Sequence, residues 1–393
     1  MIIISALDNS GQLYAADLVR ILRQQMPEQK FIGIGGPDLA AAGCELIHDI
    51  SDSSAMLTGI FGALKWAVPA FRRLKKIMAS EKVDLVILVD SPTFNLPLAK
   101  AARKHGIKTL YYIAPQIWAW AEHRWRRIRR RVDQLAVILP FEQAYFQKFG
   151  IHAQFVGHPF INHIKDAPVN ESLNAELSAL PHPVLLLMPG SRRHVVEELL
   201  PAQLRIVRQI QQKTGPMTLA LMGWKGVAPT IERLVKEGGF EFRPGAPESL
   251  RSNANIINIF FDDRKTLIEN SNLVLAASGT GTLEVAWHGR PMLIMYNTSK
   301  WFYHLIGRWL IRTRFFSLLN ILAQKEIVPE FMPYIRDEAG IADKAVELLQ
   351  DNKKAAQLGL NIQSLVRNLY HQNPADDVAQ LARKLITSSS HQS

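Results

Sequence analysis

The chain has 393 residues, enough for two domains of ordinary size, since one domain typically takes about 100–200 residues. Its composition, 48% hydrophobic and 21% charged, is typical of a globular protein and excludes a disordered or collagen-like chain. The net charge of +11 is local, because residues 65–131 hold 16 basic and 4 acidic side chains while the remainder holds 30 basic and 31 acidic. That segment predicts a surface facing nucleic acid, anionic lipid or a phosphorylated substrate.

Three features of the sequence bear on the protein's location. Cys44 is the only cysteine, which excludes an intrachain disulfide and a cysteine-based metal site and favours a reducing compartment. Residues 1–6 have no basic flank and are followed closely by Asp8, so they predict a first β-strand rather than a signal peptide. The longest uncharged candidate, residues 53–64, is too short to span a bilayer, so we expect a soluble or peripheral protein.

Short β-branched runs alternate with amphipathic stretches through the first half of the chain. Helices are predicted at residues 12–25 and 97–105. Strands are predicted at residues 2–6, 31–33, 85–89, 109–113 and 135–138. This alternation, with strands that are almost entirely apolar, predicts an α/β fold in which helices cover both faces of a parallel sheet.

A polar, proline-containing stretch at residues 162–183 indicates a linker, after which the alternation resumes. The helix predicted after residues 184–188 carries one apolar face. That face consists of Val196, Leu200, Leu204, Val207 and Ile210. Further strands are predicted at residues 217–221, 256–260, 273–276 and 291–295.

These patterns predict two doubly wound, Rossmann-like halves that face a cleft, followed by a helical tail. We assign the N-terminal domain to residues 1–165 and the C-terminal domain to residues 166–340. The tail, residues 341–393, is expected to pack back on the N-terminal domain.

A loop of phosphate-binding composition follows the strand at residues 184–188. Gly190 permits close approach of a ligand, the backbone amides after Ser191 are free at a helix N-terminus, and Arg192 can fork onto phosphate oxygens. These residues predict a diphosphate site. An ordinary helix start, capped by Ser191 with solvated arginines, explains the same residues equally well.

A second such loop follows the strand at residues 273–276. Its small and hydroxylated residues let backbone amides face a phosphate, and Glu284 can accept hydrogen bonds from two ribose hydroxyls. The alternative is a capping box with a glutamate that complements the helix dipole. Because both loops end strands of one half, we favour a nucleotide-sugar site in the C-terminal domain. Its candidate residues are Gly190, Ser191, Arg192, Ser278, Gly279, Thr280, Gly281, Thr282 and Glu284.

Two loops of the first half are also candidates. Asp90 follows the buried strand at residues 85–89, where a carboxylate suits a general base, or alternatively caps the turn through Ser91 and Pro92. The loop after the first strand can hold a sugar or phosphate, or form a tight turn in which Ser10 caps the helix. That loop contains Asp8, Asn9, Ser10 and Gly11.

The basic segment has two parts. Residues 61–79 form an amphipathic basic stretch that suits a membrane interface, and residues 124–131 hold six arginines close to Trp118 and Trp120. A solvated helix face explains either part, and arginine with tryptophan also fits nucleic acid. No helix-turn-helix, zinc or RNP-type motif accompanies them, so we favour anionic lipid and expect no nucleic-acid partner. The candidate membrane residues are Trp66, Phe71, Arg72, Arg73, Lys75 and Lys76.

The chain resembles the lipid-A-disaccharide synthase family over nearly its full length, in the order and spacing of short motifs. The matching segments are Ser10-Gly11, Gly33–Pro37, Asp90-Ser91-Pro92 with Phe94-Asn95, Pro115–Trp120, Leu139–Glu142, Gly157-His158-Pro159, Pro189–Arg192 and Ser278–Glu284. The resemblance implies a GT-B fold and inverting transfer from UDP-2,3-diacylglucosamine to 2,3-diacylglucosamine 1-phosphate, called lipid X. The products would be the β-1,6-linked disaccharide 1-phosphate and UDP.

The same resemblance implies roles for individual residues. Asp90 matches the general base, Arg192 the diphosphate arginine and Glu284 the ribose contact, while residues 61–79 match a membrane-facing region. It implies a peripheral protein on the cytoplasmic face of a Gram-negative inner membrane, with homodimerisation left open. No cofactor or metal is expected, since helix N-termini and arginine can stabilise departing UDP. The acceptor-side residues are Asp8, Asn9, Ser10, Gly11 and Asn95.

Two departures from the family pattern lie on the acceptor side. The first loop of the family usually reads Gly-Glu-x-Ser-Gly-Asp, whereas this chain has Leu7-Asp8-Asn9-Ser10-Gly11-Gln12, and Thr93 replaces a second aspartate. They leave open a paralogue that has another acceptor or that binds UDP-sugar or lipid without catalysis. A UDP-sugar epimerase of the same fold and a nucleic-acid binder are the remaining alternatives.

Overall fold

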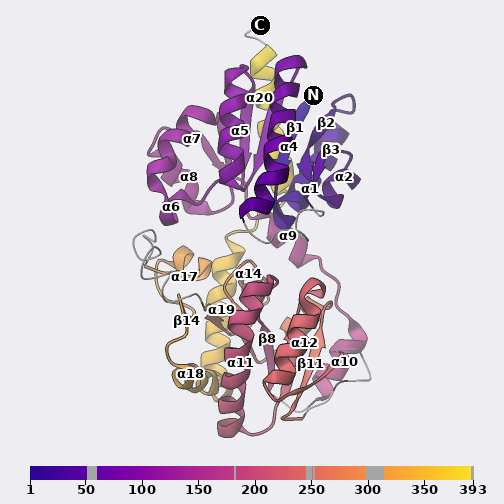
Figure 1. The fold of residues 1–393 in the computed structure, drawn as a ribbon. Helices are drawn as coiled ribbons and strands as arrows, with labels where there is room; N and C mark the ends of the chain where they lie inside the picture. The colour runs from indigo at the N-terminus through magenta and orange to yellow at the C-terminus, as the bar shows by residue number, and fades with distance from the viewer. Residues whose placement is uncertain (51–59, 181–182, 245–249, 251–252, 298–313, 391–393) are drawn as a thin grey trace. The chain divides into compact units, whose positions relative to one another are not determined.

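The chain folds into two compact units in the computed structural model, which describes residues 1–393 except 51–59, 181–182, 245–249, 251–252, 298–313 and 391–393. Unit 1 comprises residues 1–162 and 369–393, and unit 2 comprises residues 163–368 (Figure 1). Each unit contains one seven-stranded parallel sheet flanked by helices. This arrangement confirms the predicted α/β class.

The sheet of unit 1 has the order β3-β2-β1-β4-β5-β6-β7. Because the chain leaves β1 in one direction and β4 in the other, their carboxyl ends form the topological switch point, where open α/β sheets bind ligands. The strands are β1 (Ile2–Ala6), β2 (Phe31–Gly35), β3 (Glu45–Asp49), β4 (Leu85–Val89), β5 (Lys108–Tyr112), β6 (Gln134–Val137) and β7 (Ala153–Phe155). The helices are α1 (Asn9–Gln25), α2 (Pro37–Ala41), α4 (Ile60–Ser80), α5 (Pro92–Lys104), α6 (Ile117–Trp120), α7 (Trp125–Arg131), α8 (Pro140–Gln147) and α20 (Pro374–Ser390). Helix α9 (Pro159–Lys165) begins in unit 1 and ends in unit 2.

The apolar face of α4 belongs to the core of unit 1. Leu74 is fully buried, and Trp66 stacks on His48 with ring centroids 4.7 Å apart. Phe71 meets Phe94 edge to face at 5.7 Å. We expected Trp66 and Phe71 to face lipid, and both are instead partly buried and pack against the core of unit 1. The cations of the helix, Arg72, Arg73, Lys75 and Lys76, are exposed, and residues 53–59 of the apolar run lie outside the described residues.

The sheet of unit 2 has the order β10-β11-β9-β8-β12-β13-β14, again with the switch point between two central strands. Its strands are β8 (Val184–Met188), β9 (Thr218–Met222), β10 (Glu241–Pro244), β11 (Ile256–Phe260), β12 (Leu273–Ala277), β13 (Met292–Met295) and β14 (Glu330–Phe331). Its helices are α10 (Glu171–Ala179), α11 (Arg193–Thr214), α12 (Ala228–Glu237), α13 (Arg264–Asn270), α14 (Gly281–Trp287), α17 (Leu318–Ala323), α18 (Glu338–Gln350) and α19 (Asn352–Arg367). The predicted apolar face of α11 is buried, as expected.

The linker and the tail differ from their expected boundaries. Residues 171–179 of the supposed linker form α10, which buries Leu173 and Leu177 and contacts α13. In the tail, α18 adds Ile341 and Leu348 to the core of unit 2, and α19 packs on α14. Only α20 returns to unit 1, where it contacts α1, β4 and β5. The tail is therefore divided between the two units, because α18 and α19 pack on unit 2 whereas α20 packs on unit 1.

The packing of α4 yields a stability prediction. Replacing Leu74 by Ala removes a fully buried side chain, so we expect a loss of about 2–5 kcal/mol in the free energy of unfolding, measured by urea denaturation. Lys75→Ala on the exposed side of the same helix should change it by no more than about 0.5 kcal/mol. Equal stability of the two variants would contradict the assignment of this face to the core.

Candidate functional site

The switch point of unit 1 brings two carboxylates together. Ala6 at the end of β1 lies in register with Val89 at the end of β4, so the loops that follow are neighbours. The Ser91 hydroxyl lies 3.4 Å from Oδ2 of Asp8, joining the two loops. Burial raises the pKa of Asp90, and the negative charge of Asp8 raises it further. A carboxylate with a raised pKa binds a proton more readily and is therefore a stronger general base.

The backbone presents Asp90 in an unusual conformation. Asp90 and Ser91 have φ angles of 46° and 43°, in the left-handed region that non-glycine residues rarely adopt. The turn is held by the Asp90 amide, which donates to the Tyr112 carbonyl at 3.1 Å, and by the Tyr111 hydroxyl, which donates to the Asp90 carbonyl at 2.6 Å. Such strain persists only where the surroundings fix it, and it marks candidate functional sites.

The role of the Asn95 side chain differs from the acceptor contact that we expected. Its side chain is fully buried, and its Nδ2 lies within hydrogen-bond distance of three carbonyl oxygens. These belong to Ser5, Val89 and Asp90, at 3.4, 3.0 and 2.8 Å. Asn95 therefore holds the ends of β1 and β4 and positions Asp90, whereas we expected it among the residues that contact the acceptor.

The first loop is organised by Asp8. Its Oδ1 accepts a hydrogen bond from the Gly11 amide at 2.7 Å, so Asp8 caps α1 and the alternative in which Ser10 is the cap is wrong. Ser10 itself is exposed. Asn9 is the first residue of α1. Gln12, one of the departures from the family pattern, is buried. Its side chain lies against Gly36 in the loop after β2 rather than in solvent.

Glu142 is a buried carboxyl that the sequence reasoning did not single out as functional. Its Oε1 accepts a hydrogen bond from the Trp118 indole at 3.0 Å, and its Oε2 accepts one from the Leu139 amide at 3.1 Å. Burial raises the pKa of Glu142 to about 7. Glu142 thus ties the segment after β5 to the segment after β6.

The two phosphate-type loops of unit 2 lie side by side. β8 and β12 are paired in parallel, with Met188 opposite Ala276. Gly190 has φ of 102°, and a Cβ atom there would lie 3.5 Å from Ala277. Around Gly279, whose φ is 156°, a Cβ atom would meet nothing within 4 Å. Gly279 thus leaves open space beside the second loop, as a phosphate site requires, whereas a Cβ atom on Gly190 would lie 3.3 Å from the Val195 side chain.

The diphosphate candidate residues are accessible. Arg192 stands at the N-cap position of α11 with no side-chain bond to the helix start, so the Ser191 cap that we considered does not form. Both Ser191 and Arg192 are exposed. The first-turn amides of this 22-residue helix are therefore left to bind an anion, which the helix dipole favours.

Glu284 forms a buried ion pair at the start of α14. Its Oε2 lies 3.2 Å from Nη1 of Arg264, and burial raises the pKa of Glu284 although Arg264 opposes this. The capping box that we considered is not formed, because Thr280 at the N-cap makes no side-chain bond. Thr282 is buried and donates to the Gly279 carbonyl at 2.7 Å, which closes the loop. Arg264 was missed, although it follows the strand at residues 256–260 as the other candidates follow theirs.

Eleven exposed cations of unit 1 lie on the three neighbouring helices α4, α5 and α7. α5 contacts both α4 and α7, and Figure 1 shows these three helices in front of the sheet. We call this surface the cationic face. Its exposed members are Arg72, Arg73, Lys75, Lys76, Lys100, Arg103, Lys104, Arg126, Arg127, Arg129 and Arg130. In the part of the chain that the structure describes, no helix combines the length and the apolar character needed to cross a bilayer.

The contacts of Asn95 give a testable prediction. Replacing Asn95 by Ala leaves buried carbonyls of β1 and β4 without their donor, so we expect a loss of about 1–3 kcal/mol in the free energy of unfolding. Thr93→Ala, an exposed change in the same helix, is the matched control for urea denaturation. An Asn95→Ala protein as stable as the control would show that Asn95 does not hold the strand ends.

Comparison with known proteins shows which family the chain resembles in sequence and which solved structures it resembles in fold. The lipid-A-disaccharide synthetase family matches residues 2–384. The lipid-A-disaccharide synthase of Syntrophus aciditrophicus (strain SB) is 35% identical over 363 residues, which cover 91% of each chain. The UDP-GlcNAc 2-epimerase of Neisseria meningitidis, solved with UDP-GlcNAc, aligns with a TM-score of 0.62 at 12% identity, over 98% of this chain and 100% of that one. The calicheamicin glycosyltransferase CalG4 aligns with a TM-score of 0.58 at 12% identity, over 98% of each chain.

These likenesses carry different weight. At 12% identity the solved structures show only the fold, and with the two parallel sheets they confirm the predicted GT-B class. The family match spans nearly the whole chain, and the relative at 35% identity spans most of it. The chain therefore belongs to the lipid-A-disaccharide synthase family, glycosyltransferases of lipid A biosynthesis.

Proposed function

We propose that the protein condenses UDP-2,3-diacylglucosamine with 2,3-diacylglucosamine 1-phosphate, with inversion at the donor C1 carbon. The products are the β-1,6-linked disaccharide 1-phosphate and UDP. The observation that carries the proposal is the strained turn at Asp90, which holds a carboxylate of raised pKa at the switch point in a member of this family.

The donor nucleotide is assigned to the paired loops of unit 2. The amides at the start of α11 and the exposed Arg192 guanidinium would bind the diphosphate, with Gly190 allowing close approach. The second loop, which we assign to the same nucleotide, consists of Ser278, Gly279, Thr280 and Gly281. Glu284, fixed by Arg264, keeps its second carboxylate oxygen for the ribose hydroxyls.

The chemistry follows from these roles. Asp90 takes the proton from the 6-hydroxyl of the acceptor as the oxygen attacks C1 of the donor sugar. The bond from C1 to the diphosphate oxygen breaks, and its electron pair leaves with UDP. Arg192 and the helix amides stabilise the negative charge that develops on the diphosphate. Asp8 and Asn95 act on Asp90 rather than on substrate, the first through its charge and the second by positioning the backbone.

The direct experiment offers both substrates to the purified protein in detergent micelles. We expect UDP release and formation of the disaccharide 1-phosphate, detected by mass spectrometry. UDP binding without turnover on any acylated glucosamine would indicate a non-catalytic paralogue. Turnover on another acceptor would assign the departures at Gln12 and Thr93 to acceptor choice. Conversion of a UDP-sugar without acceptor would indicate an epimerase, and each of these three results would contradict the proposal.

The pair of Asp8 and Asp90 predicts a pH effect. Asp90 must be deprotonated to act as a base, so activity falls as the pH drops through its raised pKa. Replacing Asp8 by Asn removes the neighbouring negative charge, keeps an oxygen for the Gly11 amide, and lowers the pKa of Asp90. The acid limb of kcat/KM should therefore move to lower pH. Asp17→Asn, a change within α1, serves as the control. If Asp8→Asn leaves the acid limb of kcat/KM where it is in the wild type, Asp8 does not act on the base.

We further propose that the cationic face holds the enzyme at the cytoplasmic surface of the inner membrane, where its acylated substrates reside. Because the described apolar side of α4 is packed in the core, attraction to anionic lipid carries the binding, with about 1 kcal/mol per cation near the surface. Such binding weakens with salt.

Charge reversal on the cationic face tests this proposal. Lys75→Glu with Lys76→Glu should lower binding to vesicles containing phosphatidylglycerol by at least about tenfold, measured by sedimentation at low salt. Lys353→Glu with Lys354→Glu, two consecutive exposed lysines of α19, should have little effect. An equal loss of vesicle binding in the two double variants would show that binding does not depend on the cationic face.

A further inference from the structure

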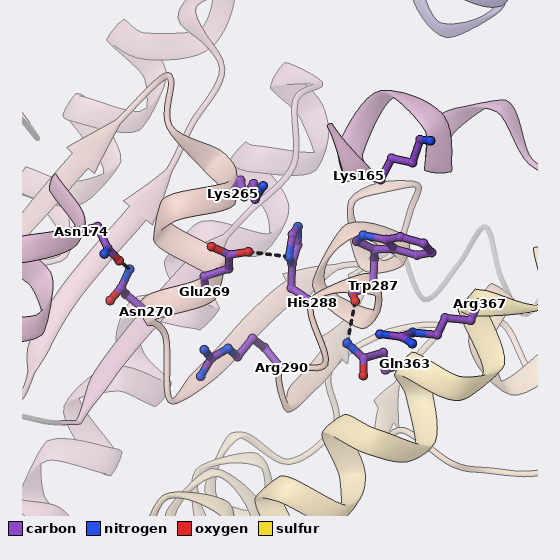
Figure 2. Close-up of a pocket in the computed structure, with 10 residues that line it drawn as sticks. All are labelled: Lys165, Asn174, Lys265, Glu269, Asn270, Trp287, His288, Arg290, Gln363 and Arg367. Atoms are coloured by element: carbon purple, nitrogen blue, oxygen red, sulfur yellow. Dashed lines mark hydrogen bonds and ion pairs between the residues drawn. The ribbon is translucent and has the colours of Figure 1, made fainter. Parts of the chain in front are cut away.

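Unit 2 contains a polar cavity of about 610 Å³ apart from the nucleotide loops. It lies among α10, α13, the end of α14 and α19, with the end of α9 at its rim (Figure 2). Its lining includes four cations, Lys165, Lys265, Arg290 and Arg367, against one carboxylate, Glu269. A cavity of this size takes a small-molecule ligand, and this charge balance favours an anion.

His288 supplies a buried polar atom in this cavity. Its side chain is only 7% exposed, and its Nδ1 lies 3.0 Å from Oε1 of Glu269. Its Nε2 is buried and has no hydrogen-bond partner in the described structure. Burial lowers the pKa of His288, and although Glu269 opposes this, Lys265 and Arg290 add to it. The neutral ring that results donates from Nδ1 to Glu269 and keeps a lone pair on Nε2.

The cavity is built by close packing rather than by loose surface side chains. Gly289 has φ of 65°, and a Cβ atom on Gly359 would lie 2.0 Å from the Gly289 carbonyl oxygen, so α19 packs directly on the turn before Arg290. Gln363, one turn further along α19, donates to the Trp287 carbonyl at 2.9 Å. Lys265 is fixed from the other side, where its Nζ donates to the Ala167 carbonyl at 2.8 Å.

We propose that this cavity is a second anion site, which binds a small soluble ligand carrying a phosphate monoester or diphosphate group. The guanidinium groups of Arg290 and Arg367 engage the phosphate oxygens, with Lys165 and Lys265 adding positive charge. Nε2 of His288 accepts a hydrogen bond from a ligand hydroxyl or a protonated phosphate oxygen. The proposal does not rest on the proposed transferase activity, because no residue of the two nucleotide loops lines the cavity.

Calorimetric titration of the full-length protein with inorganic diphosphate, in the absence of UDP, tests the proposal. We expect a binding event that is weakened at least about tenfold by Arg290→Gln and by Arg367→Gln, since each guanidinium group supplies charge-assisted hydrogen bonds to the ligand. Arg290→Lys and Arg367→Lys should retain most of the affinity. Arg192→Ala should leave it unchanged, and so should Arg233→Gln, an exposed arginine of α12.

Two results would overturn the proposal of a second anion site. One is affinity of the glutamine variants equal to that of the wild type, and the other is diphosphate binding that Arg192→Ala alone abolishes. A glutamine variant that fails to fold is replaced by a spectroscopic measurement on the wild type. The C2 proton of His288, assigned by comparison with His288→Asn, should shift on titration with diphosphate, and a resonance that stays fixed would equally overturn the proposal.

Discussion

The left-handed backbone at Asp90 and Ser91 is the constraint on which the candidate site of unit 1 depends. At φ near 45° these residues turn the chain sharply out of β4. The strained turn is held because Tyr111 and Asn95 donate hydrogen bonds to the Asp90 carbonyl and the Asp90 amide donates one to the Tyr112 carbonyl. The same turn places the Asp90 carboxylate close enough to Asp8 for the two charges to interact. Geometry and basicity of the carboxylate therefore have one origin, the way the loops after β1 and β4 are tied together.

The alternation of buried strands and amphipathic helices was enough to predict the fold. Continuous apolar runs such as residues 85–89 and 184–188 are diagnostic of parallel strands buried on both faces, and both are strands here. The strands missed lie at or near the sheet edges, where β3 is only partly buried and β14 has two residues. Short, partly polar strands carry little periodic signal.

The errors about the site arose where tertiary contacts decide a side chain's role. The spacing of Trp66 and Phe71 shows an apolar helix face, but only the packed structure shows that this face packs against the core of unit 1. Asn95 stands in a family motif, yet three backbone carbonyls around its amide give it a positioning role. Arg264 was missed because its partner, Glu284, is twenty residues away in sequence, and the two side chains meet only in the folded unit 2.

In the proposed reaction the Asp90 carboxylate removes the acceptor proton while unit 2 binds the nucleotide. The most direct measurement compares turnover and UDP affinity of Asp90→Asn with those of the wild type, using both acylated substrates in micelles. We expect kcat to fall by about 10²–10⁴, the usual contribution of a general base, with the dissociation constant for UDP unchanged. Turnover within a few-fold of the wild type would contradict the claim, and so would a parallel loss of UDP affinity.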